Sequence, residues 1–300
     1  MDRNAQPLPN QAPRLISSLA ALFAAQTETA AVGLGGSRIG TMTDAASDID
    51  LYVLTRGGEI PLATRRAIVE QISGASRADL GLTYWGTGDE WIDAVTGIEV
   101  DVVYFDIDWL AGEVRRVLGD HSAALGYTTC FWHTVRSLRL LYDRDGRLAA
   151  LQAEADAPYP EPLRRNIIAL NRPVLRDIIP SYTTQIEKVV KRGDRVSVNH
   201  RLAALLASYF DILFAFNRVP HPGEKRLVAR AEALCPRLPD GMAVDLASIL
   251  AASGTADSSV MVHLHRLLDR LDKLLAADAT LEVEVMADLH LHGASRLELC

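Results

Sequence analysis

The chain has 300 residues, of which 49% are hydrophobic and 23% charged, a composition typical of a globular protein with about two domains. Its formal net charge of -7 argues against binding of long nucleic acid, which needs basic groups to neutralise phosphates, and would suit a cationic small substrate. The three cysteines, Cys130, Cys235 and Cys300, form no metal-binding or disulfide pattern, and we find neither a signal-peptide pattern nor an apolar run of membrane length. We therefore expect a cytoplasmic protein that works without a membrane.

The first predicted elements lead into a glycine turn. Apolar residues at helical spacing predict a helix over 14–26, and the short apolar run 31–34 predicts a buried strand. The turn 35–37 ends this strand, and its glycines allow a ligand to approach the backbone closely. A second buried strand is predicted over 51–54, directly after an aspartate pair.

Asp48 and Asp50 form that pair and are the first candidate site residues. Residues two apart on a strand point to the same face, so both carboxylates project together while Ile49 turns into the core. Two adjacent carboxylates repel each other unless a cation lies between them. Mg²⁺ binds through one or two carboxylates together with substrate phosphates, so we predict a magnesium site at the start of this strand.

Gly36 and Ser37, a gap of ten residues, and then Asp48 and Asp50 resemble the signature of the DNA polymerase beta-like nucleotidyltransferase superfamily. The resemblance covers about the first third of the chain. It implies that Ser37 and the backbone amides from the glycine turn to Arg38 hold the phosphates of a nucleoside triphosphate. It also implies that both aspartates bind Mg²⁺, and that a third carboxylate on a later strand completes the metal site or takes a proton from the acceptor hydroxyl.

A strand predicted over 97–105 offers two candidates for that third carboxylate. It is apolar and β-branched apart from Glu99 and Asp101, which lie two apart and therefore share a face. The polymerase-like pattern falls on Asp101, which would then bind metal. A similar strand in the aminoglycoside adenylyltransferases that modify streptomycin and spectinomycin carries a glutamate base, and this resemblance points to Glu99. Both acids are therefore candidate catalytic residues.

The rest of the first half connects these strands. We expect a helix over 61–72, a strand over 78–85 and a polar loop from residue 86 onward. Asp106 and Asp108 lie beyond the end of the strand 97–105, so we expect them to be structural.

Beyond residue 109 the pattern becomes almost wholly helical. We expect an α+β protein, with a short mixed twisted sheet in a nucleotidyltransferase domain over 1–125 and an all-helical bundle over 126–300 that closes over the nucleotide. The predicted helices cover 112–118, 131–141, 163–192 with breaks at Pro173 and Pro180, 198–217, 224–234, 242–252 and 260–277.

The most informative stretch of the second half is 203–234, an apolar helix followed by a proline-rich turn and a further helix. It resembles the carboxy-terminal helical domain of the same aminoglycoside adenylyltransferases, in which a lysine after the turn contacts the triphosphate. Lys225 is the matching position. A lysine early in a helix faces the positive end of the helix dipole, which favours an anion bound nearby.

These features together predict a Mg²⁺-dependent nucleotidyltransferase. The resemblance implies transfer of a nucleoside monophosphate, AMP from ATP, to a hydroxyl of a small molecule such as an aminoglycoside antibiotic, with release of pyrophosphate. Two alternatives remain open: an AMP-transferring enzyme of the toxin and antitoxin type that modifies a protein hydroxyl, and a nucleotide-binding regulatory module without turnover.

Overall fold

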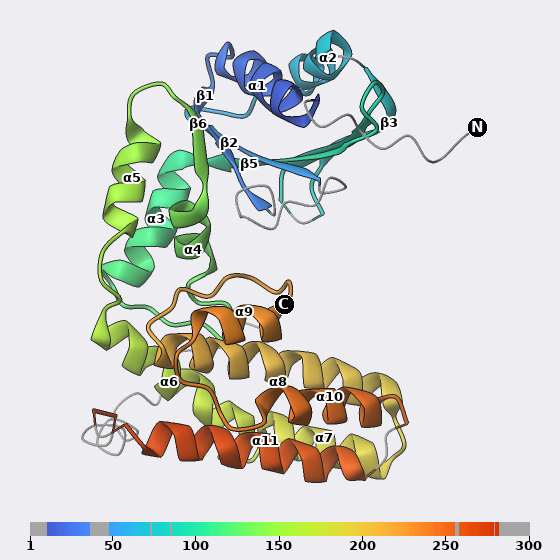
Figure 1. The fold of residues 1–300 in the computed structure, drawn as a ribbon, viewed down its shortest axis with the longest axis vertical. Helices are drawn as coiled ribbons and strands as arrows, with labels where there is room; N and C mark the ends of the chain where they lie inside the picture. Colours follow the sequence, from blue (N-terminus) through green and yellow to red (C-terminus); the bar gives the residue numbers. More distant parts are fainter. Residues whose placement is uncertain are drawn as a thin grey trace. The chain divides into compact units, whose positions relative to one another are not determined.

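The computed structural model describes residues 11–36, 48–72, 74–84, 86–255, 258–278 and 280–281 (Figure 1). The predicted α+β class is confirmed, because a mixed sheet with helices forms the amino-terminal part and a helical region follows it. The chain is divided into two compact units. The first unit consists of 1–119 and 131–158, and the second consists of 120–130 and 159–300. The domain limit expected at residue 125 lies inside the short stretch 120–130.

The sheet of the first unit has six strands within the described residues, in the spatial order β3-β4-β5-β2-β1-β6. Strands β2 and β5 pair in parallel, and the other neighbouring strands pair antiparallel. This mixed sheet places two strands that are far apart in the sequence side by side at its centre. The strands are β1 Thr29–Leu34, β2 Ile49–Thr55, β3 Ala75–Leu82, β4 Gly88–Asp93, β5 Glu99–Asp106 and β6 Arg139–Asp143.

Helices α1 (Gln11–Ala24) and α2 (Leu62–Ile72) cover one face of the sheet (Figure 1). The apolar stripe of α1 includes Leu19 and Phe23, both almost fully buried, at the spacing of one helical turn. The covered face of β2 and β5 is apolar and buried, whereas alternate residues on both strands point to the other face. The core of the first unit therefore lies between the sheet and these two helices, and the second face of β2 and β5 carries acids at the start of the strands and aromatic residues further along, among them Tyr52 and Phe105.

Strand β4 lies where we expected a polar loop, so that prediction was wrong. Buried and more exposed residues alternate along β4, but two of the buried positions are aspartates, so hydrophobicity does not reveal the pattern in the sequence. The carboxylate of Asp89 accepts hydrogen bonds from the Arg65 guanidinium at 3.1 Å, from the Gly81 amide at 2.7 Å and from the Tyr104 hydroxyl at 2.7 Å. A buried carboxylate with several donors is tolerated in a strand, because its lost hydration is replaced.

The segment after β5 continues directly into α3 (Ile107–Leu118), which starts earlier than expected. Asp106 is the N-cap of this helix, and its side chain accepts hydrogen bonds from the amides of Asp108 and Trp109, both at 2.9 Å. A capping aspartate satisfies amides that have no partner inside the helix. The structural role that we predicted for Asp106 is confirmed, but its expected place beyond the strand was wrong, because Asp106 is the last residue of β5 and no loop precedes the helix.

The single helix expected over 131–141 is a helix followed by a strand. Helix α4 (Cys130–Ser137) ends before β6, which pairs with the edge of β1, and α5 (Arg147–Ala155) follows. Backbone pairing with an available strand edge overrides helical spacing over so short a run. Arg144 then fixes the end of β6 through hydrogen bonds to the carbonyl oxygens of Thr29, Ala24 and Gln26.

The second unit is helical. Its longest helix, α8, is buried along nearly the whole of its second half, including Tyr209, Phe210 and Phe214, as expected for the central helix of a bundle. Pro173 lies inside α6, so the predicted break there was wrong, whereas the break near Pro180 is confirmed. The helices are α6 Glu161–Arg176, α7 Tyr182–Lys191, α8 Arg195–Phe216, α9 Leu227–Leu234, α10 Met242–Ser253 and α11 Ser259–Ala276.

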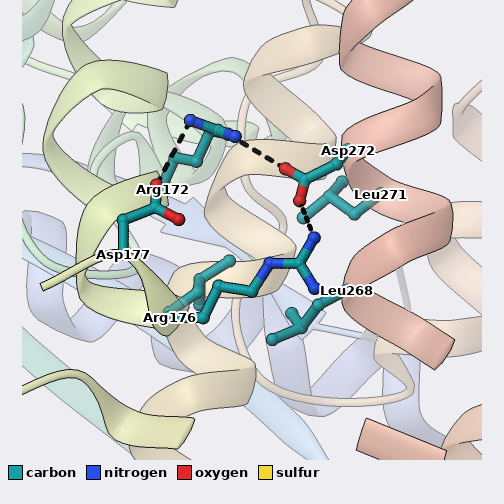
Figure 2. Close-up of a pocket in the computed structure, with 7 residues that line it drawn as sticks. Arg172, Arg176, Asp177, Leu268, Leu271 and Asp272 are labelled. Carbon is teal, nitrogen blue, oxygen red and sulfur yellow. Dashed lines mark hydrogen bonds and ion pairs between the residues drawn. The ribbon is translucent and has the colours of Figure 1, made fainter. Parts of the chain in front are cut away.

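Ion pairs join α6 to α11 within this unit. Figure 2 shows Arg172 between Asp177 and Asp272, with nitrogen–oxygen distances of 3.2 Å and 2.9 Å, and Arg176 paired with Asp272. Arg176 also pairs with Asp269 at 2.6 Å. These side chains close the shallow pocket that they line, so we regard it as a structural contact between helices.

Within the described residues, none of the helices combines the length and the apolar character needed to cross a membrane.

Candidate active site

Asp50 and Asp101 lie directly opposite each other on the adjacent parallel strands β2 and β5. Their neighbours Ile49 and Val100 are fully buried on the covered face, so both carboxylates point to the other face of the sheet. Asp48 is exposed and immediately precedes β2. The structure therefore brings three of the predicted acids to one region at the start of two central strands.

Glu90, on β4, belongs to the same face, because it lies directly opposite Asp101. Glu99 lies two residues before Asp101 and is exposed. We call this surface, defined by Asp50, Tyr52, Glu90, Glu99 and Asp101, the acidic face. It carries three acids that the sequence singled out, Asp50, Glu99 and Asp101, and one carboxylate that it did not, Glu90.

The glycine turn lies against Asp50. The Gly35 amide donates a hydrogen bond to the Asp50 carbonyl oxygen at 2.8 Å, which fixes the turn beside β2. Gly36 has a φ of +67°, and a Cβ atom added there would lie 1.7 Å from Asp50 Oδ2. A Cβ atom on Gly35 would meet the Tyr52 ring at 2.4 Å. Both positions therefore need glycine, and the backbone of Gly36 is in direct reach of a predicted metal ligand.

Ser37 and Arg38, which we expected to hold phosphates together with Gly36, lie outside the described residues. Their roles stay predictions from the sequence.

The pKa of Tyr52 is affected by two carboxylates of the acidic face. Tyr52 lies two residues after Asp50 on β2 and is half-buried. Burial, which is the largest cause, and the negative charges of Asp50 and Asp101 together raise its pKa to about 12. The hydroxyl therefore stays protonated at neutral pH and lies within the field of both carboxylates.

Glu99 lies among several carboxylates. A hydrogen bond between the carboxyl groups of Glu99 and Glu90 is the largest cause that raises the pKa of Glu99. Burial and the negative charges of Asp48, Glu90 and Asp101 raise it further. A carboxyl with a raised pKa is better matched to proton transfer near neutral pH than an ordinary carboxylate.

Sequence reasoning did not identify Glu90, because its segment was interpreted as a loop. The usable signal was the alternation in Gly88–Asp93, in which every second residue is buried. Apolar residues normally reveal such a pattern, but here Asp89 and Asp93 occupy buried positions beside Trp91. A search for strand alternation that accepts buried aspartates would have placed Glu90 on the exposed face.

The carboxylates of the acidic face fit a Mg²⁺ ion that is also bound by the phosphates of a substrate. Carboxylate oxygens are hard ligands, and Asp50 and Asp101 present them from neighbouring positions. Among the described residues, no group of three His, Cys, Asp or Glu side chains is arranged to hold a metal ion by itself. Mg²⁺ commonly uses one or two carboxylates, several waters and the phosphates of a substrate, so these acids fit an ion that arrives with a nucleotide.

Lys225 lies in the second unit and is exposed. Helix α9 begins at Leu227 with Arg226 as its N-cap, so Lys225 precedes the helix instead of lying in its first turn. The turn before it is fixed by buried His221, whose amide donates to Thr129 Oγ1 at 2.7 Å. His221 Nδ1 accepts a hydrogen bond from the Gly223 amide at 3.1 Å. Lys225 is therefore presented by an anchored turn.

Residues 132–227 match a family model described as a domain of unknown function, DUF4037. This stretch covers less than half of the chain; it includes Lys225 and excludes the residues of the acidic face. No curated protein matches the chain.

Among solved structures, the chain is similar to a nucleotidyltransferase-like protein from Exiguobacterium sibiricum 255-15. The sequence identity is 14% and the TM-score 0.41, and the alignment covers 88% of this chain and 74% of the other.

Proposed function

We propose that this chain is a Mg²⁺-dependent nucleotidyltransferase. It would transfer a nucleoside monophosphate, AMP from ATP, to a hydroxyl group of a small molecule and release pyrophosphate. The observation that carries this proposal is the alignment of Asp50 with Asp101 on neighbouring parallel strands, with the Gly36 backbone against Asp50. The glycine turn and these acids are separated in the sequence, and they lie next to one another in the folded sheet.

Four carboxylates at the start of β2 and β5 have roles in this proposal. Asp48, Asp50 and Asp101 are the proposed metal ligands, and they would hold the triphosphate in position through the ion. Bound Mg²⁺ would neutralise charge on the phosphates and polarise the bond to the leaving pyrophosphate. Glu99 would accept the proton of the acceptor hydroxyl. The hydroxyl oxygen would at the same time form a bond to the α-phosphorus, and the bond to the departing pyrophosphate would break.

The proposed phosphate ligands are the glycine turn and, from the sequence resemblance, Lys225. The backbone amides of Gly36 and its neighbours, with Ser37 and Arg38, would contact the outer phosphates, since successive amides in such a turn form an anion site. Lys225 would add a positive charge beside the γ-phosphate. Catalysis would rest mainly on positioning and on charge neutralisation at phosphorus.

The proposed acceptor is a cationic small molecule, such as an aminoglycoside-like antibiotic, which would make the protein an antibiotic-resistance enzyme. The net charge of -7 and the carboxylates of the acidic face support a cationic acceptor, because such a surface attracts positive charge. A protein hydroxyl is the alternative acceptor.

Pyrophosphate release tests the proposal. The purified chain is incubated with Mg²⁺ and each of the four common nucleoside triphosphates, with and without a panel of aminocyclitol and aminoglycoside compounds. We expect release with one triphosphate, dependent on Mg²⁺ and stimulated by at least one cationic acceptor, and loss of release in Asp50→Asn. Nucleotide binding without release under any condition would instead support a regulatory module. No binding of any triphosphate would contradict both functions.

A further inference from the structure

Four aromatic rings of the first unit form a continuous cluster that begins beside the acidic face. Tyr52 lies two residues after Asp50 on β2, and its ring centroid is 6.2 Å from that of Phe105 on β5. Phe105 stacks on Trp109 of α3, with centroids 5.3 Å apart and ring planes 21° from parallel. Phe131, near the start of α4, is perpendicular to both of these rings. We call Tyr52, Phe105, Trp109 and Phe131 the aromatic cluster.

Trp109 takes no part in the packing that holds α3 in the first unit. The buried stripe of this helix consists of Ile107, Leu110, Val114 and Val117. Trp109 lies outside the stripe and is 45% exposed, although tryptophan is highly buried on average in folded proteins. A large exposed ring that is continuous with other rings and with a group of carboxylates is typical of a binding site.

One flat face of the Trp109 ring is not covered by the other rings of the cluster. Phe105 stacks against the opposite face, and Phe131 has its centroid 5.0 Å from Trp109 and 5.8 Å from Phe105. These nearly equal distances place Phe131 beside the stacked pair. The Trp109 amide donates a hydrogen bond to the Asp106 carboxylate at 2.9 Å, which fixes the backbone that carries the ring. Trp109 therefore offers a supported flat surface on which another ring can stack.

The aromatic cluster and the glycine turn lie on opposite sides of the two central acids. The Gly36 backbone lies against Asp50 at the start of β2. Phe105 follows Asp101 by four residues on the neighbouring parallel strand, which corresponds to about 13 Å along the strand. A nucleotide with its phosphates at the turn and the acids would therefore extend its uncharged end toward the rings.

The proposed acceptor belongs with the carboxylates instead. Glu99, the proposed base, is the first residue of β5, and Glu90 lies opposite Asp101 on β4. Phe105 lies six residues beyond Glu99 on the same strand. Carboxylates attract a cationic acceptor, whereas an uncharged aromatic ring gains affinity by stacking on other rings. The two kinds of side chain thus provide separate places for the two substrates.

We propose that the aromatic cluster is the base-binding subsite of this protein, and that the base of the nucleoside triphosphate stacks on the uncovered face of Trp109. This inference rests on the proposed function for the place of the phosphates. Trp109 contacts the base alone and has no part in the chemical step. Every base has a flat face, so stacking supplies affinity for the nucleotide whichever base it carries.

Calorimetric titration with two ligands tests the subsite. Mg²⁺ with ATP presents phosphates and a base, and Mg²⁺ with inorganic triphosphate presents phosphates alone. Trp109→Leu keeps an apolar side chain and removes the ring, so we expect about a 10-fold loss of ATP affinity and unchanged affinity for inorganic triphosphate. Trp109→Phe should retain most of the ATP affinity, because phenylalanine still offers a flat ring.

Leu62 provides a matched control. It is the first residue of α2, which covers the other face of the sheet, and at 38% its exposure is close to that of Trp109. Leu62→Ala removes a half-exposed apolar side chain away from the acidic face, so it should bind both ligands as the parent does. Thermal unfolding of each variant checks that the fold is retained.

Two results would overturn the inference. ATP affinity in Trp109→Leu equal to that of the parent would show that no base stacks there, and a raised KM for the acceptor alone would then assign the rings to the acceptor. An equal loss of affinity for ATP and inorganic triphosphate would show that the substitution acts on the phosphate site and not through the base.

The same titrations separate the subsite from the proposed function. If Trp109→Leu loses affinity for ATP alone but the parent releases no pyrophosphate, the subsite is supported and the transfer reaction is contradicted. If the parent releases pyrophosphate and Trp109→Leu binds ATP normally, the reaction stands and the subsite is contradicted. A parent chain that binds no ATP would contradict both.

Discussion

Asp50 on β2 and Asp101 on β5 face each other across two parallel strands, with the backbone of Gly36 in contact range of Asp50. Adjacent strands are separated by about 4.8 Å, so the two carboxylates repel each other at neutral pH. A cation bound between them would remove this repulsion.

Asp50→Asn should abolish function and spare the fold. We expect pyrophosphate release to fall by about 100-fold or more, because the substitution removes a ligand and a charge from the phosphate site. The Tm should stay equal to that of the parent or rise, because the repulsion with Asp101 is relieved. Turnover and thermal unfolding measured on the same sample check both parts. A near-normal rate would end the nucleotidyltransferase proposal.

Glu99→Gln and Asp101→Asn should fail in different ways. A base is needed for proton removal, so Glu99→Gln should bind Mg²⁺ and ATP normally and turn over slowly, by about 100-fold. A metal ligand supports the nucleotide itself, so Asp101→Asn should also lose ATP affinity in the presence of Mg²⁺. Calorimetric titration with ATP separates the two effects. If both variants retain the full rate, β5 takes no part in the reaction.

Gly36→Ala should be far more damaging than Gly57→Ala. Both glycines have positive φ, of +67° and +78°, so alanine strains the backbone at each by about 1 kcal/mol. Only at Gly36 would the new Cβ atom collide with Asp50, at 1.7 Å from Oδ2, whereas nothing lies within 4 Å at Gly57. We expect loss of Mg²⁺-dependent ATP binding in Gly36→Ala alone, measured by titration alongside thermal unfolding. Equal binding in the two variants would contradict the contact.

Lys225→Ala should weaken triphosphate binding without destabilising the protein. Lys225 is exposed, so we expect the lower end of the range for a charge-assisted contact, about a 10-fold loss of ATP affinity. The loss should be smaller for AMP, which has no γ-phosphate. Lys188→Ala, an exposed lysine on α7, is the control and should bind ATP normally. Unchanged ATP affinity in Lys225→Ala would show that the resemblance in the second half has no functional meaning, and it would contradict the acceptor proposal that depends on this resemblance.

Asp278 should contribute to acid sensitivity. Hydrogen bonds from Thr280, together with the charge of buried Arg164, lower its pKa to about 2. Because this value lies below the roughly 3.9 of an unfolded aspartate, the stabilisation is present above about pH 4 and is lost as the pH falls toward 2. We expect Asp278→Asn to lower Tm at pH 6, and the difference from the parent to shrink between pH 4 and pH 2. A constant difference across that interval would contradict this origin.

Local sequence predicted most of the elements and only part of the site. The glycine turn, the strand that follows Asp48 and the helices of the second unit were identified because their signals lie within a dozen residues. The alignment of Asp50 with Asp101 depends on parallel pairing between segments about fifty residues apart, which no local pattern encodes.

The missed strands have two different physical causes. Buried aspartates hide β4, and with it Glu90, from any pattern based on hydrophobicity. Strand β6 exists because β1 offers it an edge, so its conformation is set by a distant partner instead of by its own residues. Both are cases in which tertiary contacts decide the local structure.

The path of the chain between the two units limits how the protein can be dissected. Because 131–158 returns to the first unit after the excursion 120–130, a fragment that stops at residue 125 would lack β6 and the helices α4 and α5. Its β1 edge would be left unpaired, and the backbone groups that Arg144 now satisfies would lose their donor. Exposed strand edges recruit other chains, so such a fragment would aggregate. Splitting the gene at a single point within 120–130 would therefore separate the two segments of the first unit, and recombination could exchange its sheet only as two separate segments.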